Sequence, residues 1–256
     1  MAAPTGTLWL VPNTLDLGTA TDAALDEVLP RTAIGRAAGL SHWVVEDAKS
    51  ARAFLKRVQA LHPLPGPLQT IDIRELPRPP KDGRAAADPQ AWRELLAPAL
   101  AGADIGLLSE AGLPAVADPG ALVVAAAHEA GIRVVPLAGA SSLTLALAAS
   151  GLHGQSFAFV GYLPTDTAAR TARLRELETQ SRRTGQTQIA IETPYRNVAL
   201  AAALIDGLQP ETRLAIACGL TLPEGWCITR RVKDWRGAPP AFGDRTLPAV
   251  FLWLAG

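Results

Sequence analysis

The sequence has few cysteines, few histidines and no long apolar run, and each shortage excludes a class of protein. Only Cys218 and Cys227 occur in 256 residues, without the C-x-x-C spacing of zinc sites or the dense framework of small secreted domains. The four histidines form no metal-spaced cluster. No apolar run approaches the roughly 20 residues of a membrane span, and the first residues lack the basic segment of a signal peptide. We expect no metal, no membrane and a cytoplasmic location.

The chain also lacks an excess of charge of either sign. Lys and Arg number 24 and Asp and Glu number 24, so a polyanion would have to be bound at a local site. No strand is followed by G-x-G-x-x-G or G-x-x-x-x-G-K-[ST], and no G-x-S-x-G segment is present. These absences exclude the usual loops for dinucleotides and nucleoside triphosphates and the usual serine hydrolase site.

The pattern of apolar runs predicts an α/β protein of two domains. Short runs typical of buried strands alternate with alanine-rich helical stretches up to residue 151, which favours a mostly parallel sheet. Beyond it the last strands follow one another without helices, so we expect a C-terminal domain over residues 152–256 with a mixed sheet, and a ligand cleft between the two. The expected strands are 7–11, 42–46, 70–74, 105–109, 133–137, 157–162, 188–192, 214–218, 226–232 and 249–254. The expected helices are 22–29, 51–61, 89–100, 122–130, 141–149, 167–182 and 197–208.

The segment 105–120 is the richest candidate site. It reads Ile105-Gly-Leu-Leu-Ser-Glu-Ala-Gly-Leu-Pro-Ala-Val-Ala-Asp-Pro-Gly120, a buried strand that ends at Ser109 and a loop that reaches a helix near Asp118. Ligands dock at the carboxyl ends of parallel strands, where the next helix adds free N–H groups. Asp118 alone is equally well explained as a helix N-cap. The loop as a whole is longer than a simple turn requires, which favours a functional role.

Two further strand ends carry polar residues. The strand at 133–137 is followed by Gly139 and then by Ser141 and Ser142, which would either let a ligand approach the backbone or merely cap a helix. Because this strand is the next one along the chain, we expect its loop to lie beside the loop of 105–120. Glu192 and Arg196 follow another strand, and they either edge a ligand or form a structural ion pair.

Further motifs join those above. Together they are Gly6-Thr-Leu-Trp-Leu-Val-Pro12, Glu46-Asp47, Leu108-Ser-Glu-Ala-Gly-Leu-Pro114 with Asp118-Pro-Gly120, Val134-Val-Pro136 with Gly139 and Ser141, Gly161-Tyr-Leu-Pro164 and Glu192-Thr-Pro-Tyr-Arg196. In order and spacing these motifs resemble the tetrapyrrole methylase family over nearly the whole chain. Within that family the sequence is most similar to the branch of ribosomal small-subunit methyltransferase I, which 2′-O-methylates a cytidine of 16S rRNA. The resemblance implies a homodimer with S-adenosylmethionine (SAM) held between two α/β domains.

The resemblance also implies which residues contact SAM. They come from the first strand's loop, from the main cofactor loop, from the next strand end and from positions that border the adenosine. In that order they are Pro12; Ser109, Glu110, Ala111, Gly112 and Pro114; Ser141 and Ser142; and Tyr195 and Leu220. A hydroxyl acceptor would need a proton acceptor as well, and the carboxylates nearest the expected cleft are Glu110, Asp118 and Glu192. The sequence does not choose among them.

Two loops depart from the ribosomal branch. The residues after Pro12 read Asn13-Thr-Leu-Asp-Leu-Gly18, shorter than the branch's P-T-P-I-G-N-L-G, and residues 70–84 lack its histidine-rich loop. Both lie at or near strand ends on the side of the expected cleft, so we predict that the acceptor is not the usual 16S cytidine or is handled differently. An RNA, a small or macrocyclic metabolite and SAM binding without catalysis all remain open.

A helix at 167–182 offers the one candidate for RNA contact outside the cleft. It carries five arginines in or just after it, which could contact phosphates. Acidic residues are interspersed at helical spacing, so an ordinary solvated face with i,i+3 ion pairs explains the same residues. The arginines are Arg170, Arg173, Arg175, Arg182 and Arg183, and the acids are Asp166, Glu176 and Glu178.

Overall fold

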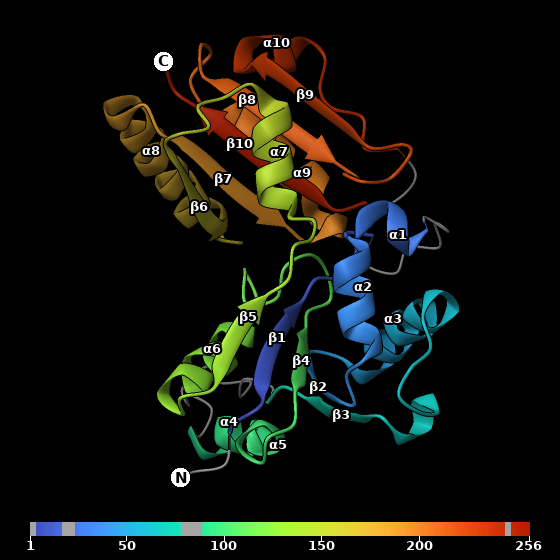
Figure 1. Ribbon diagram of the computed structural model, residues 1–256. Coiled ribbons are helices and arrows are strands. Elements are labelled where there is room, and N and C mark those ends of the chain that lie inside the picture. Colours follow the sequence, from blue (N-terminus) through green and yellow to red (C-terminus); the bar gives the residue numbers. More distant parts are fainter. Residues whose placement is uncertain (1–3, 17–23, 78–88, 244–246) are drawn as a thin grey trace. The chain divides into compact units, whose positions relative to one another are not determined.

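The apolar runs form two five-stranded sheets in the computed structural model, which describes residues 4–16, 24–77, 89–243 and 247–256 (Figure 1). Each sheet is the centre of its own compact unit, Met1–Ala140 and Ser141–Gly256. The α/β class is therefore confirmed, with one sheet in each half of the chain. Within the described ranges, no helix is both long and apolar enough to cross a membrane.

The first sheet is wholly parallel and has the strand order β3-β2-β4-β1-β5. Its strands are β1 (Thr7–Val11), β2 (His42–Val45), β3 (Asp72–Glu75), β4 (Ile105–Leu108) and β5 (Arg133–Pro136). The strand β1 lies between β4 and β5. The other neighbour of β4 is β2, which comes from far earlier in the chain. All five carboxyl ends, and the loops that follow them, share one edge of the sheet.

Helices cover both faces of the first sheet, which explains why the central strand β4 is apolar and buried at every position. Alternate side chains of a strand point to opposite faces, so Trp43 of β2 lies in one core and Val44 in the other. The Trp43 core contains α1 (Leu25–Val28), α2 (Arg31–Ala38) and α3 (Ala48–Leu61), with the short 3₁₀ turn Leu68–Thr70 beside it. The Val44 core contains α4 (Pro89–Leu95), α5 (Ala97–Leu100) and α6 (Gly120–Glu129).

The second sheet is mixed, as the sequence predicts, with the order β6-β7-β10-β8-β9. Only the β6–β7 pair is parallel. The helix α7 (Ser142–Ser150) packs on β8, β9 and β10, while α8 (Thr167–Thr184), α9 (Asn197–Gly207) and α10 (Val232–Gly237) enclose the larger core on the other face (Figure 1). The strands are β6 (Phe157–Tyr162), β7 (Thr187–Glu192), β8 (Arg213–Cys218), β9 (Trp226–Arg231) and β10 (Ala249–Leu254), with a 3₁₀ turn at Pro194–Arg196.

Several element boundaries differ from the expected ones for local reasons. The compact units divide before α7 rather than after residue 151, because Ala146 and Leu147 of α7 pack on the second sheet. The expected helix 89–100 breaks at Leu96, since Pro98 cannot donate a backbone hydrogen bond within it. The helices α2 and α10 were not expected. The start of the expected helix 22–29 lies outside the described residues.

Candidate functional site

A buried asparagine after β1 anchors the loop that follows β4, residues 109–119. Asn13 is only 7% exposed, and its Nδ2 donates to the carbonyl oxygens of Ser109 and Glu110 at 3.0 and 3.1 Å. Its backbone N–H donates to the Gly112 carbonyl at 2.8 Å. One side chain thus fixes two strand-end loops to each other. The sequence offered Asn13 only as part of a divergent loop, and nothing in its spacing showed that its amide would face β4.

The loop after β5 meets the same pair of loops through glycine. A Cβ at Gly139 would lie 2.2 Å from the Cβ of Pro12, so no larger residue fits against that proline. Gly112 has a φ of +69°, and a Cβ there would lie 3.5 Å from the carbonyl oxygen of Ala140. The loops after β4 and β5 therefore lie side by side, as expected, although β1 separates the two strands themselves.

The loop after β4 holds two alanines in the left-handed backbone region. Ala115 has a φ of +67° and Ala117 a φ of +65°, and such residues cost on the order of 1 kcal/mol or more each. Asp118 follows them, and its Oδ1 accepts from the N–H of Gly120 at 2.6 Å. Its Oδ2 is buried and has no hydrogen-bond partner among the described residues. Oδ1 of Asp118 therefore contacts the start of α6 as a helix cap would. Capping does not explain the burial of Oδ2 without a hydrogen-bond partner among the described residues.

Three carboxylates, those of Glu46, Glu110 and Asp118, lie near the ends of β2 and β4. Glu46, just after β2, accepts through Oε1 from the backbone N–H of Glu110 at 3.0 Å. The Glu110 side chain in turn accepts from the hydroxyl of Ser50 in α3. These contacts exist because β2 and β4 are neighbours, which their distance in the sequence conceals.

Burial raises the pKa of each of these carboxyl groups above its usual value. For Glu46, burial outweighs the hydrogen bond from the Glu110 backbone, and the charge of Asp118 raises the pKa further. For Glu110, burial outweighs the hydrogen bond from Ser50, and nearby carboxylates add to the rise. For Asp118, burial outweighs the N–H groups of the loop backbone. In the part of the chain that the structure describes, no Lys or Arg forms an ion pair with any of the three. Clustered carboxyl groups with raised pKa values are typical of functional sites.

Four further expected residues lie in the loop after β4 and at the start of α7. Ser109 is buried, and its hydroxyl donates to the Ala111 carbonyl at 3.2 Å. Pro114 is buried within the loop. Ser141 occupies the N-cap position of α7, but its side chain makes no capping hydrogen bond, and Ser142 is the first residue of that helix. The hydroxyl of Ser141 is thus not used as an ordinary cap.

In the second unit the structure supports the ion-pair interpretation of Glu192. Its carboxylate lies 3.4 Å from the guanidinium of Arg196 and accepts from the N–H of Thr193 at 2.8 Å. Tyr195 lies beside this pair and is 77% exposed, so its ring is open to contact. Leu220, after β8, packs partly against the core beneath α7. Of the three carboxylates proposed as proton acceptors, Glu192 alone has a cationic partner among the described residues.

The charged face of α8 divides into two groups. Arg173 and Glu176 form the expected i,i+3 pair at 2.7 Å, and Asp166 caps the helix by accepting from the N–H of Ala169. Glu178 is buried instead of solvated: its Oε1 accepts from the Gln209 N–H at 2.8 Å and from a threonine hydroxyl. The interpretation of α8 as an ordinary solvated face is therefore right for Arg173 and Glu176 and wrong for Glu178.

One known protein family matches most of this chain. The family model for tetrapyrrole (corrin/porphyrin) methylases matches residues 42–230, a span that includes Glu46 after β2 and the loop after β4 with Glu110 and Asp118. The chain belongs to this family. The resemblance read from the sequence motifs is thus confirmed. In the described parts of the chain, no three His, Cys, Asp or Glu side chains are grouped as metal ligands would be.

Relatives of this chain carry names from the ribosomal branch. The ribosomal RNA small subunit methyltransferase I of Synechocystis sp. is 41% identical over 129 residues, which are 50% of this chain and 45% of the relative. The protein of the same name from Micromonospora olivasterospora is 46% identical over 112 residues, 44% of this chain and 34% of the relative. The matches therefore span less than half the length of either relative.

A solved structure shares the fold. It is uroporphyrin-III C-methyl transferase from Thermus thermophilus complexed with S-adenyl homocysteine, with a TM-score of 0.53 at 20% identity. The alignment covers 97% of this chain and 92% of that one.

Proposed function

We propose that this chain is a SAM-dependent methyltransferase whose acceptor is a ribose hydroxyl of ribosomal RNA. The observation that carries the proposal is the family match across the loop after β4, where carboxyl groups with raised pKa values meet a strained backbone. The names of the relatives favour an RNA acceptor over a metabolite.

The residues present fit a cofactor of this kind. SAM carries a sulfonium and an ammonium group, and carboxylates that lack cationic partners complement those charges. The buried, unpartnered Oδ2 of Asp118 is one such group. Ser109, Glu110, Ala111, Gly112 and Pro114 of the same loop, with Pro12, Ser141, Ser142, Tyr195 and Leu220, are the residues we assign to cofactor binding. The cofactor supplies the methyl group, and no metal is required.

The protein's own part is to align the acceptor oxygen and to take its proton. Alignment alone, with water excluded, is worth roughly 7 kcal/mol or more of an activation barrier. A carboxylate whose pKa lies above the ordinary range is the better base at neutral pH. Burial gives that property to Glu110 and Asp118, whereas Glu192 is already paired with Arg196. We therefore assign the proton acceptor to Glu110 or Asp118.

Cofactor binding is tested by calorimetric titration with SAM, S-adenosylhomocysteine and NAD. We expect the first two to bind and NAD not to bind. Ser141→Trp should abolish binding, because the added ring fills space before α7, whereas Leu145→Trp on the same helix, 39% exposed in the wild type, should not. Pro114→Arg should also abolish binding. NAD binding without SAM binding, or wild-type affinity in a folded Ser141→Trp variant, would contradict the assignment.

The acceptor is tested by methyl transfer from radiolabelled SAM to small ribosomal subunits, tRNA and a metabolite extract. We expect label in the ribosomal RNA. In a bacterium that lacks small-subunit methyltransferase I, we expect incomplete restoration of the cytidine 2′-O-methyl group by mass spectrometry, because the loop after Pro12 departs from that branch. Of the two divergent loops, residues 17, 18 and 78–84 lie outside the described residues. Full restoration would contradict this expectation, and label only in metabolites would contradict an RNA acceptor.

A homodimer working in the cytoplasm completes the proposal. The family resemblance supports the dimer, and an RNA acceptor supports the location. Light scattering at micromolar protein should give twice the 26.8 kDa of one chain. A stable species of one chain's mass would contradict the dimer.

A further inference from the structure

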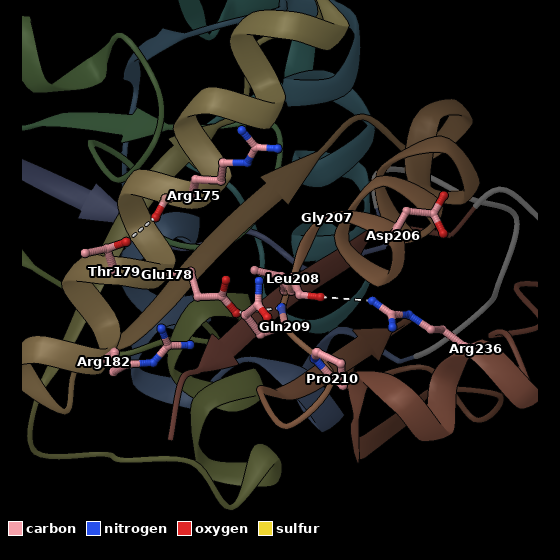
Figure 2. A pocket seen from close by; sticks show the side chains of 10 residues that line it. All are labelled: Arg175, Glu178, Thr179, Arg182, Asp206, Gly207, Leu208, Gln209, Pro210 and Arg236. Carbon is pink, nitrogen blue, oxygen red and sulfur yellow. Dashed lines mark hydrogen bonds between the residues drawn. The ribbon is translucent and has the colours of Figure 1, made fainter.

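A hollow in the second unit is lined by three arginines and has none of the residues assigned to SAM in its lining. It measures about 470 Å³ and is formed by α8, the end of α9 and the following turn, and α10 (Figure 2). Arg175 and Arg182 come from α8 and Arg236 from α10. Arg175 and Arg182 are seven residues apart, about two helical turns, so they lie on one side of α8. The volume is in the range of roughly 300–1,000 Å³ that small-ligand pockets have.

Two of the arginines are held in place by backbone carbonyl groups. Arg236 donates from Nε to the Ile205 carbonyl at 3.2 Å and from Nη2 to the Leu208 carbonyl at 3.1 Å. Arg182 donates from Nε to the Gly256 carbonyl at 3.1 Å. Among the described residues, the guanidinium of Arg175 has no hydrogen-bond or ion-pair partner. The carbonyl groups of Ile205 and Leu208 orient the guanidinium of Arg236 without neutralising it, so the positive charges of Arg175 and Arg236 stay available.

The two carboxylates at the hollow do not cancel this charge. Glu178 is 5% exposed, and its Oε1 accepts from the Gln209 N–H and the Thr212 hydroxyl, so it serves the turn between α9 and β8. Asp206 lies on the opposite side from Arg175 and Arg182 (Figure 2). Among the described residues, neither Glu178 nor Asp206 forms an ion pair with an arginine of the hollow.

We propose that this hollow binds a backbone phosphate of the RNA substrate, an inference that rests on the proposed RNA acceptor. The forked guanidinium group matches the oxygens of a phosphate, and arginines on both sides of the hollow would hold it from two directions. Phosphate contacts supply the salt-dependent part of nucleic-acid affinity and fix register without reading sequence. The site would give a role to Arg175 and Arg182 of α8, which take no part in the Arg173–Glu176 ion pair.

The test is the salt dependence of binding to small ribosomal subunits. The double variant Arg175→Ala/Arg182→Ala is compared with Arg183→Ala, an exposed arginine of the same helix that does not line the hollow. We expect the double variant to bind about tenfold more weakly at low salt, and the slope of log affinity against log salt to fall by about 0.7–0.9 for the lost contact. Arg183→Ala should behave as wild type. Binding of S-adenosylhomocysteine should be unchanged in all three proteins.

Each contrary outcome has a separate meaning. Equal slopes in the double variant and in Arg183→Ala overturn the phosphate site and leave the methyltransferase proposal standing. Wild-type protein that binds S-adenosylhomocysteine but no ribosomal subunit overturns both this inference and the RNA acceptor, while absence of both kinds of binding overturns the proposed function itself. Thermal stabilisation by millimolar inorganic phosphate that the double variant loses, with an unchanged RNA slope, would show a free-anion site and overturn the RNA assignment.

Discussion

The three carboxylates near the ends of β2 and β4 and two carboxylates of the second unit, Glu192 and Glu211, are held in opposite ways. At the ends of β2 and β4, Glu46, Glu110 and Asp118 are crowded, partly buried and without ion pairs among the described residues, and their pKa values are raised. In the second unit Glu192 pairs with Arg196, and Glu211 pairs with Arg231 and Lys233, which together lower its pKa. Paired carboxylates are ordinary products of folding, whereas unpaired ones cost stability and persist at sites that serve another purpose. The contrast therefore locates the chemistry in the first unit's loops.

The most severe way to break this contrast is to push the first unit's loops apart. Gly139→Ala places a Cβ about where Pro12 already lies, and overpacking of this kind costs roughly 1–3 kcal/mol or more. We expect a drop of several degrees in Tm and at least a hundredfold loss of S-adenosylhomocysteine affinity. Gly154→Ala in the second unit is the control, because nothing lies within 4 Å of a Cβ there. Equal affinities for the two variants would show that the loop contact is dispensable.

A milder disruption removes one buried amide from each unit. Asn13 holds the carbonyl groups of Ser109 and Glu110, and Asn197 holds the Leu247 carbonyl at 2.8 Å. Replacing either by Ala leaves buried carbonyl oxygens unpaired, at a cost of about 1–3 kcal/mol in the free energy of unfolding. Only Asn13→Ala should also weaken cofactor binding, by about tenfold. Calorimetry with both variants checks this, and equal weakening would remove the distinction between the units.

Asp118 and Glu211 should affect the pH dependence of the protein's stability with opposite signs. The pKa of Asp118 is higher in the folded protein than its unfolded value of about 3.8. The contribution of Asp118 to stability therefore falls as pH rises from the unfolded pKa through the folded pKa. Asp118→Asn should therefore gain stability relative to wild type between pH 3.5 and pH 7. For Glu211 the lowered pKa has the opposite effect, so Glu211→Gln should lose stability at pH 7 and match wild type in acid. Thermal melts of the variants at both pH values give the signs, and like signs would contradict the assignment.

The smallest effect is expected at the exposed pair of α8. Arg173→Ala removes a surface ion pair with Glu176 of 2.7 Å. Such i,i+3 pairs contribute about 0.5 kcal/mol or less and are screened by salt. The Tm should change by about a degree and RNA binding should not change, in contrast to the arginines of the hollow. A loss of RNA affinity as large as that of the double variant would extend the phosphate site onto this face.

The sequence predicted the sheets well because strand identity is a local property. The ten expected strands match the ten observed strands within a few residues, and the mixed second sheet followed from its consecutive strands. The helices α2 and α10 were missed because both are short: α2 also carries Gly35 in its interior, which weakens the helical pattern, and α10 follows β9 without a break.

The site could be predicted only in part, since its contacts depend on which strands are neighbours. The loop after β4 was found from its length and its glycines and prolines. The bond from the Glu110 N–H to Glu46 and the anchoring role of Asn13 were not found, because β2 and β1 flank β4 only in the folded sheet. Burial of Glu178 likewise needs the turn before β8 to be in place.

The central position of β1 also bears on the order of events during synthesis. β1 is made first, yet its partners β4 and β5 end at residues 108 and 136. At roughly 5–20 residues per second, the ribosome needs several seconds to tens of seconds to supply them, and non-local pairing of this kind is slow in any case. During that interval the apolar residues of β1 have no sheet to join. We therefore expect the nascent chain to be a client of ribosome-associated chaperones until β5 emerges.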